Sequence, residues 1–163
     1  MIRHIVAIDN QRGMAKNGAM PPWKLHRDEQ YFTEQTLSHG GEVLMGRKTF
    51  VEALHERPLT NRTNYVVTRD STPITGAVVM NNLEDFISDW PPGKDLWVIG
   101  GSEIFAQTMG QADELYITEI EALFDCDKFY PPYTGNFELV SKSALQTEND
   151  LHYYFCVYQP KKS

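Results

Sequence analysis

Short apolar segments alternate with helix-like segments along the first two-thirds of the chain, and this alternation constrains the fold more than any other feature. Segments rich in aliphatic or β-branched residues, which predict strands, are residues 2–8, 43–45, 63–68, 77–80 and 96–99. Helical patterns separate them, from residue 28 to a stop signal at 38–41 and then at 47–54, 83–90 and 102–109. A chain that alternates in this way is expected to form a mainly parallel sheet covered by helices.

The last third of the chain is rich in strand signals. Residues 114–120, 137–145 and 151–159 have strand patterns with no helical segment between them. Such strands add to a parallel sheet as antiparallel partners at one edge. We therefore expect an α/β fold with a central, mainly parallel twisted β-sheet, an antiparallel C-terminal hairpin and about four flanking helices.

Length and composition indicate one domain over residues 1–163. A chain of 163 residues, 41% hydrophobic and 23% charged, has the size and balance of one globular core. No apolar run approaches the roughly 20 residues that a bilayer span needs. The apolar N-terminal stretch lacks a small-residue cleavage site, so we expect a cytoplasmic protein with no membrane partner.

The net charge of −7 argues against general nucleic-acid binding, which needs a basic surface. It still allows a few local arginines to bind an anionic small ligand. Cys126 and Cys156 are better interpreted as free thiols in a reducing cytosol than as a disulfide. Asp125, Cys126 and Asp127 have no partner histidine at ligand spacing, so we predict no metal site.

Residues 9–23 form a long segment rich in Gly, Asn and Pro between the first strand and the first helix. Loops of this length are uncommon in a compact domain and often close over a binding site. We expect a functional loop here.

Three strand ends have features that suit a phosphate-bearing ligand. Gly100-Gly101 follows the apolar strand LWVI and opens a helix, and Gly46-Arg47-Lys48-Thr49 joins a strand to a basic helix start. Thr68-Arg69 offers a hydroxyl and a guanidinium group for a phosphate monoester. Each has a plainer interpretation alone: a tight turn, a solvated basic turn or a surface arginine. Together they indicate a ligand site, because ligands of open α/β sheets bind at the carboxyl ends of the strands.

Two familiar phosphate motifs do not fit these segments. The glycines at 100 and 101 do not form a G-x-G-x-x-G fingerprint. A P-loop requires Lys directly after its second glycine, and Arg47 stands there instead.

Asp28 is the most informative acidic residue. It lies at a helix start, four residues before Phe32, so both side chains can share one helix face. Near Trp23, Leu25 and Phe32, its carboxylate would be partly desolvated and its pKa raised. The plainer alternative is an ordinary helix N-cap.

Five segments then resemble the successive motifs of the dihydrofolate reductase family, of the bacterial chromosomal type, in order and at suitable spacing. These are AMPPWKLHRDEQYF, VLMGRKTF, RPLTNRTNYVVTR, VIGGSEIF and ELYITEI. Any one motif is weak evidence, but five in register over about residues 1–159 are specific. The resemblance implies the dihydrofolate reductase fold and a monomeric NADPH-dependent oxidoreductase. It also implies dihydrofolate as substrate, antifolates as inhibitors and a place in one-carbon metabolism.

The resemblance implies a role for each matching residue of the substrate site. Asp28 holds the pterin ring, Thr118 supports that contact, Trp23 helps to order a water, and Arg62 pairs with the substrate's glutamate carboxylate. The implied catalytic residues are Asp28, Trp23, Thr118 and Met20. The implied substrate-binding residues are Ile5, Val6, Ala7, Asp28, Phe32, Leu54, Arg57, Arg62, Ile99, Phe105 and Thr118.

The resemblance likewise implies a cofactor site. Arg47, Lys48, Thr49, Thr68 and Arg69 hold the NADPH phosphates, and a cis peptide typically joins the two glycines at 100 and 101. The whole implied cofactor-binding set is Ala7, Met14, Ala15, Gly46, Arg47, Lys48, Thr49, Thr68, Arg69, Gly100, Gly101, Ser102, Glu103, Ile104 and Phe105.

The reaction that the resemblance implies is hydride transfer to C6 of dihydrofolate with protonation of N5. Asp28 favours that protonation, with the proton arriving from water, while the protein aligns the rings and excludes solvent. The chain departs from the family pattern at Ala15, Pro21-Pro22 and His26, and Cys126-Asp127-Lys128 replaces a commoner Gly-Asp-Thr. These changes lie in or near the expected loop, so we expect them to affect turnover rate rather than reaction class.

Two other hypotheses remain open at this point. A related reductase, such as the pyrimidine reductase of riboflavin synthesis, would keep the NADPH segments but act on a phosphosugar. A catalytically silent protein would bind NADPH or folate without turnover. Trp23, Asp28 and Arg62 favour a pterin-glutamate substrate over the first, and cofactor-oxidation kinetics would separate an enzyme from the second.

Overall fold

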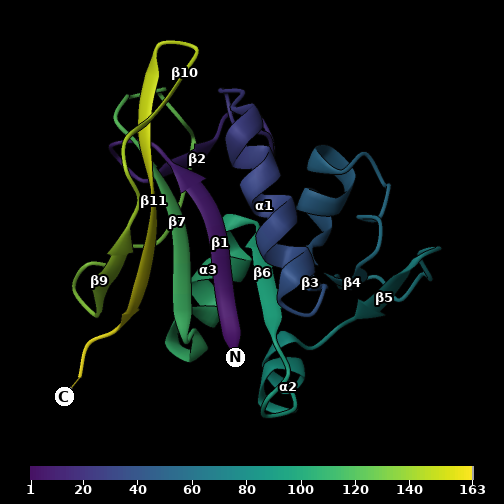
Figure 1. Cartoon of the computed structure of the whole chain (residues 1–163). Helices are drawn as coiled ribbons and strands as arrows, with labels where there is room; N and C mark the ends of the chain where they lie inside the picture. The colour runs from purple at the N-terminus through teal and green to yellow at the C-terminus, as the bar shows by residue number, and fades with distance from the viewer. Residues whose placement is uncertain (163) are drawn as a thin grey trace.

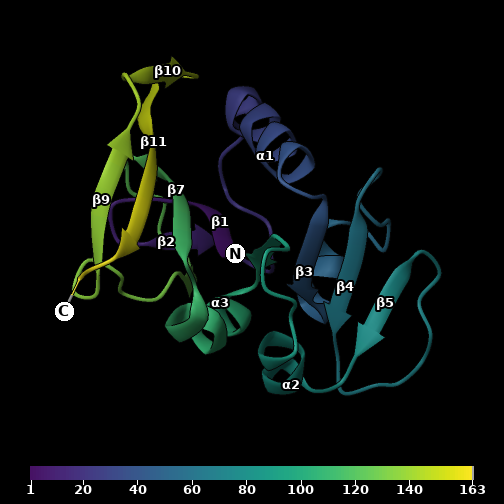
Figure 2. The ribbon, with the colours of Figure 1, turned by 60° about the horizontal axis from the view of Figure 1, so that its bottom comes forward.

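A large twisted β-sheet organises the computed structural model of the chain, which describes residues 1–162 (Figures 1 and 2). The strand order is β10-β11-β7-β1-β6-β3-β4-β5, and β9 also pairs with β11. The strands are β1 Ile2–Ile8, β3 Glu42–Gly46, β4 Thr63–Val67, β5 Ala77–Met80, β6 Leu96–Gly100, β7 Glu114–Ile120, β9 Phe137–Lys142, β10 Gln146–Glu148 and β11 Leu151–Pro160. A separate small ribbon joins β2 (Gly13–Ala15) to β8 (Lys128–Phe129).

The pairing directions confirm the expected fold class. The strands from β7 through β1, β6, β3 and β4 to β5 pair in parallel. The C-terminal strand β11 runs antiparallel to β7, and β9 and β10 run antiparallel to β11. The mainly parallel sheet therefore carries its antiparallel strands at the C-terminal edge, as the strand-rich last third predicts.

Helical segments cover both faces of the sheet. They are α1 (His26–Ser38), α2 (Leu83–Ser88), α3 (Ser102–Thr108), a π-helical turn η1 (Thr49–Ala53) and a 3-10 turn η2 (Met109–Gln111). Figure 2 shows α1 on one side of the sheet and α2 and α3 on the other. Among residues 1–162, no helix is both long and apolar enough to cross a membrane.

The central strands are buried on both sides, which explains why their sequences are continuous apolar runs rather than alternating ones. Val43, Leu44 and Met45 of β3 and Trp97 and Val98 of β6 are fully buried. Leu44 and Val98 pack in one cluster with apolar residues of α2 and α3. The others pack on the opposite face in a second cluster with residues of η1 and α1.

The structure differs from the expectations mainly at element boundaries. Helix α1 begins at His26, and its N-cap position is held by Leu25, so the N-cap interpretation of Asp28 is wrong. The strand expected at 137–145 ends at Lys142, and a separate strand begins at Gln146. The expected loop 9–23 contains β2, whose pairing with the distant β8 leaves no local pattern in the sequence.

Candidate active site

Two adjoining cavities lie at the carboxyl ends of β3, β4 and β6. The smaller has a volume of ≈ 210 Å³ and the larger ≈ 630 Å³. They share the lining residues Lys48, Thr49, Gly101, Ser102 and Lys128, so they meet at one junction. The site therefore lies where ligands of open α/β sheets bind.

The smaller cavity is mostly apolar. Its walls come from the loop after β1, from α1, from η1 and from the end of β6. Besides the shared junction residues, its lining consists of Met14, Ala15, Gly18, Ala19, Phe32, Glu52, Ala53, Leu54, Ile99 and Gly100. Such a lining suits a flat, largely apolar ring system.

The larger cavity is a basic groove. Arg47, Lys48, Arg69 and Lys128 line it, whereas Asp70 and Glu103 are the carboxylates in the lining. The excess of cations suits a ligand with several phosphate charges. This local charge is opposite in sign to the net charge of the whole chain, −7.

Asp28 connects α1 with β7 beside this site. The hydroxyl of Thr118 donates a hydrogen bond of 2.6 Å to Oδ1 of Asp28. Burial raises the pKa of the Asp28 carboxyl to about 6, the Thr118 hydrogen bond opposes this rise, and the negative charges of Glu29 and Glu148 add to it. The ordinary pKa of an aspartate carboxyl is 3.8. Because the pKa is raised this far, the carboxyl can change its protonation state close to neutral pH.

Thr118 is paired in the sheet with Ala7 and Phe155, which belong to an apolar cluster around Trp23. Trp23 is buried, packs with Leu25 and Tyr153, and lies with its ring centroid 5.1 Å from that of Phe124. On the next turn of α1, Phe32 reaches the wall of the smaller cavity on the same helix face as Asp28. Asp28 itself is not among the residues that line the cavity, and Phe32 connects its helix face to that wall.

Arg62 is a half-buried arginine outside the lining of both cavities. Among residues 1–162, Nε and Nη1 of its guanidinium group have no hydrogen-bond partner. Burial lowers its pKa. Buried guanidinium nitrogens without a partner are unfavourable, so they suit an anionic group such as a carboxylate.

The loop after β1 is anchored over the smaller cavity. The Asp9 carboxylate accepts hydrogen bonds from the backbone N–H groups of Gly13 (2.8 Å) and Phe124 (3.1 Å). Further along, the Asp127 carboxylate accepts one from the backbone N–H of Asn17 at 3.0 Å. These contacts and the β2–β8 ribbon hold the segment expected to be a functional loop against the site.

Most residues expected at the site from the sequence line the two cavities. Met14, Ala15, Phe32, Leu54, Ile99 and Gly100 line the smaller one, and Gly46, Arg47, Lys48, Thr49, Thr68, Arg69, Gly101, Ser102, Glu103 and Ile104 line the larger one. The peptide bond between Gly100 and Gly101 is cis, as the resemblance implies. A Cβ on Gly100 would lie 3.3 Å from Oγ1 of Thr49, at a φ of +136° that favours glycine.

Other expected residues line neither cavity, among them Asp28, Trp23, Thr118 and Arg62. Met20 is 48% exposed and Arg57 is also exposed, whereas Phe105 is fully buried. Phe105 lies behind Gly100 and packs against His4 and Tyr130, with ring centroids 5.0 Å apart in both pairs. Its burial in the core explains why it does not reach the cavity surface.

Strand β1 places three of the expected residues near the Asp28–Thr118 pair. Ile5 is buried in the core, and Val6 and Ala7 are half-buried. Ala7 is paired with Thr118 in the parallel β1–β7 ladder, which places it beside the Asp28–Thr118 pair.

Several lining residues were missed from the sequence. Gly18, Ala19, Glu52, Ala53, Val67, Asp70, Asn81, Leu83, Gln107 and Lys128 complete the two walls. Gly18 and Ala19 lie within the segment expected to be a functional loop, so their signal was present. Lys128 comes to the site through the long-range β2–β8 pairing, which no local pattern reveals.

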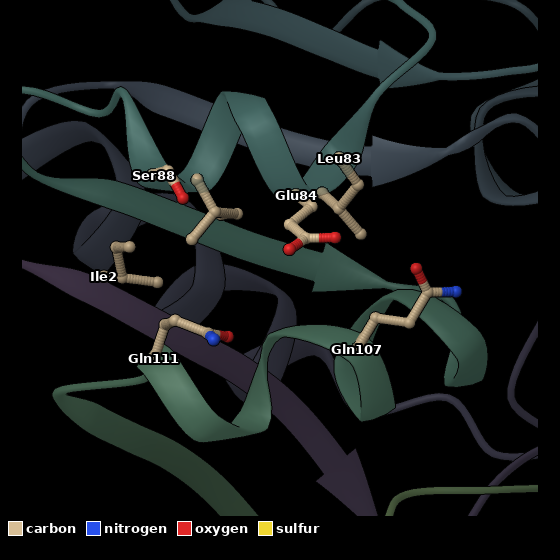
Figure 3. A pocket seen from close by; sticks show the side chains of 7 residues that line it. Ile2, Leu83, Glu84, Ser88, Gln107 and Gln111 are labelled. Atoms are coloured by element: carbon tan, nitrogen blue, oxygen red, sulfur yellow. The ribbon is translucent and has the colours of Figure 1, made fainter.

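A third cavity, of ≈ 390 Å³, opens between α2 and the α3–η2 segment (Figure 3). Leu83 and Gln107 line both this cavity and the larger groove. The polar side chains that face it in Figure 3, from Glu84, Ser88, Gln107 and Gln111, are exposed. Solvent satisfies them, so this cavity makes no demand for a specific ligand.

A basic groove meets an apolar cavity, and a half-buried carboxyl lies on the helix that supplies part of the cavity wall. This arrangement is typical of an α/β nucleotide-dependent enzyme that brings a phosphate-rich cofactor against a flat substrate. Comparison with known proteins identifies the family within this class. The family model described as dihydrofolate reductase matches residues 1–160. The chain belongs to the dihydrofolate reductase family.

Individual relatives agree with the family match. The chain is 35% identical over 167 residues to a dihydrofolate reductase of Bacillus subtilis (strain 168), covering 100% of this chain and 96% of that protein. It is 37% identical over 155 residues to one of Staphylococcus aureus, covering 93% and 92%. A solved dihydrofolate reductase from Enterococcus faecalis, complexed with NADP(H) and RAB-propyl, superposes with a TM-score of 0.86 at 30% identity, covering 99% and 97%.

Proposed function

We propose that this chain reduces 7,8-dihydrofolate to 5,6,7,8-tetrahydrofolate with NADPH, supporting one-carbon metabolism, and that Asp28 is its central catalytic residue. The observation that carries the proposal is a half-buried carboxyl with a pKa of about 6, held by Thr118 beside an apolar cavity. Family membership supplies the reaction, which is NADPH-dependent reduction of dihydrofolate.

The larger groove fits the cofactor. Arg47, Lys48, Arg69 and Lys128 provide cations for its phosphates, and the groove meets the smaller cavity at Thr49 and Gly101. When bound, NADPH supplies the hydride that goes to C6 of dihydrofolate. We assign Thr68-Arg69 to the 2′-phosphate, because an exposed arginine next to a threonine hydroxyl at a strand end suits a phosphate monoester.

The smaller cavity fits the pterin ring of the substrate. Phe32, Leu54 and Ile99 line it and would hold the ring against the junction with the groove. The Asp28 carboxyl would accept hydrogen bonds from the amino group and the neighbouring N–H of the ring, which fixes its orientation. Arg62, whose Nε and Nη1 are buried without a partner among residues 1–162, would pair with the glutamate carboxylate at the other end of the substrate.

The raised pKa of Asp28 gives this carboxyl its chemical role. A carboxyl with a pKa of about 6 still holds a proton in about a tenth of molecules at pH 7. This environment favours protonation at N5, because a protonated imine accepts a hydride more readily. The loop anchored by Asp9 and Asp127 would keep bulk water away from the reacting atoms.

The other features of the proposal follow from the family and from the composition. We propose one domain over residues 1–163, a monomer, a cytoplasmic location and inhibition by antifolates that compete for Asp28. A phosphosugar substrate is disfavoured, because the chain belongs to the dihydrofolate reductase family.

Asp28→Asn tests the proposal directly. An amide cannot carry the charge or proton of the carboxyl, so we expect turnover to fall by roughly 10²-fold or more, with NADPH binding nearly unchanged. The measurement is the loss of NADPH absorbance with and without 7,8-dihydrofolate, alongside NADPH titration of both proteins. Near-normal turnover of the variant at neutral pH would contradict the role of Asp28. Lack of dihydrofolate-dependent oxidation by the native protein would contradict the function.

A further inference from the structure

We propose that Lys128, carried on the loop ribbon, binds the pyrophosphate of the cofactor at the junction of the two cavities. This inference rests on the proposed function, because it takes the larger groove as the NADPH site.

The first observation is the position of Lys128. Its side chain lines both the apolar cavity and the basic groove, together with Lys48, Thr49, Gly101 and Ser102. A dinucleotide that reaches from the groove into the apolar cavity must pass this junction. The pyrophosphate is the part of NADPH between the adenosine, which carries the 2′-phosphate near Arg69, and the nicotinamide. A cation at the junction therefore lies closer to the pyrophosphate than to the 2′-phosphate.

The second observation is how Lys128 reaches that position. It belongs to β8, which pairs with β2 in the loop after β1, and Ala15 is its direct partner in the ladder. The adjacent backbone N–H of Asp127 donates to the carbonyl of Ala15 at 3.0 Å. The Lys128 backbone is thus attached to the loop that covers the smaller cavity, while Lys48 approaches the junction from the opposite wall, before η1.

The third observation is that the ammonium group is free to change partner. Its nearest carboxylate is that of Asp127, with Nζ 3.7 Å from Oδ1, and the two side chains are 44% and 47% exposed. An exposed pair at this distance holds the ammonium weakly. The other Asp127 oxygen, Oδ2, is already bound to the backbone N–H of Asn17. A pyrophosphate with two negative charges is the stronger partner for Lys128.

Cofactor binding experiments separate Lys128 from the 2′-phosphate site. We expect Lys128→Met to weaken binding of NADPH and of NADH equally, each by about tenfold, as loss of one charge-assisted contact predicts. The same variant should bind 2′-AMP, which lacks the pyrophosphate, as tightly as the native protein does. Lys128→Arg should restore most of the affinity. Isothermal titration calorimetry with the whole protein measures all three ligands without requiring turnover.

Lys16→Met is the matched control. Lys16 lies on the same loop next to β2, is 41% exposed, and pairs with Asp125 at 3.7 Å. It is not among the residues that line either cavity. We expect this variant to keep native affinity for all three ligands.

The outcomes distinguish failure of this proposal from failure of the function. Unchanged NADPH affinity in Lys128→Met, an equal loss in Lys16→Met, or an equal loss of 2′-AMP affinity would each overturn the role of Lys128. A native protein that binds NADPH but does not oxidise it with dihydrofolate would overturn the proposed reaction and leave the Lys128 result standing. A native protein that binds neither NADPH nor NADH would overturn both.

Discussion

Asp28 shows how one side chain acquires a chemical role from its surroundings. An aspartate in the first turn of an exposed helix normally has a low pKa and interacts with the helix dipole. Here burial raises the pKa of the carboxyl to about 6, while the Thr118 hydrogen bond lowers it. Because burial outweighs the hydrogen bond, the neutral form persists to a higher pH than in an unfolded chain.

The pH dependence of hydride transfer is the first test at this scale. The raised pKa means that Asp28 loses its proton above about pH 6, so the rate should fall about tenfold per pH unit above this value. Thr118→Val removes the hydrogen bond that opposes the rise, and the midpoint of this fall should move to higher pH. Single-turnover rates of both proteins from pH 5 to 9 measure this midpoint. A midpoint that moves down, or does not move, would contradict the assigned interaction.

The same shift affects stability. The unfolded chain releases the proton of Asp28 near its ordinary pKa of 3.8, whereas the native protein keeps it to about pH 6. The native state therefore binds more protons in this window, and the contribution of Asp28 to the free energy of unfolding decreases as the pH rises through it.

Arg69 provides a test of cofactor discrimination. It is exposed in the larger groove beside Thr68, and the proposed partner is the 2′-phosphate, which NADH lacks. We expect Arg69→Ala to weaken NADPH by about tenfold and NADH by much less, since a lost charge-assisted contact has this order of magnitude. Calorimetry of both cofactors with the native protein and the variant measures the two losses of affinity. Equal losses would remove Arg69 from the 2′-phosphate site.

At the scale of elements, the β2–β8 ribbon joins the loop after β1 to residues more than a hundred positions away. Gly13 pairs with Phe129, and the Asp9 carboxylate accepts hydrogen bonds from the backbone of Gly13 and of Phe124. One buried carboxylate therefore connects β2 to the segment that precedes β8. The position of the loop over the smaller cavity depends on these hydrogen bonds of the Asp9 carboxylate.

Gly13→Ala tests the ribbon. A Cβ at Gly13 would lie 2.6 Å from Cβ of Cys126 and 2.8 Å from both carboxylate oxygens of Asp9, so the ribbon must shift. We expect a loss of about 1–3 kcal/mol in the free energy of unfolding and a lower turnover. Denaturant unfolding and steady-state kinetics measure these effects.

Gly135→Ala is the control for this substitution, because a Cβ at Gly135 would meet nothing within 4 Å. We expect native stability and turnover in this variant. A native-like Gly13→Ala protein, or equal losses in both variants, would show that the ribbon contact is not what holds the loop.

At the scale of the whole molecule, both ends of the chain contribute to one sheet. The N-terminal strand β1 lies between β6 and β7, and the C-terminal strand β11 pairs with the other side of β7 (Figure 1). The two cavities open on the carboxyl ends of strands from within this sheet. The proposed site is therefore assembled by a single copy of the chain.

A monomer is the expected state, since one copy provides both cavity walls. Light scattering after size exclusion should give a mass near 18.7 kDa, with and without NADPH. A stable mass of twice this value would contradict the proposal of a monomer and would call for a second copy at the exposed surfaces.

The sequence by itself determined the fold class and much of the cofactor groove. Alternating strand and helix patterns are local, and the carboxyl ends of parallel strands must meet, so Gly46, Thr68 and Gly100 could be assigned to one edge of the sheet before the structure was known. The resemblance to a family placed Asp28 and Arg62, although composition alone favoured a helix cap for Asp28. Strand β2 and the break at 143–145 were missed, because their boundaries depend on distant partners.

Only the tertiary structure decided the environments of the residues. The raised pKa of Asp28 depends on its burial in the fold. The two buried Arg62 nitrogens without a partner among residues 1–162 likewise depend on which groups the fold brings near them. Lys128 reaches the junction through a β-ladder with residues near position 15. Desolvation and long-range pairing are properties of the folded chain, because they arise from contacts between segments that are far apart in the sequence.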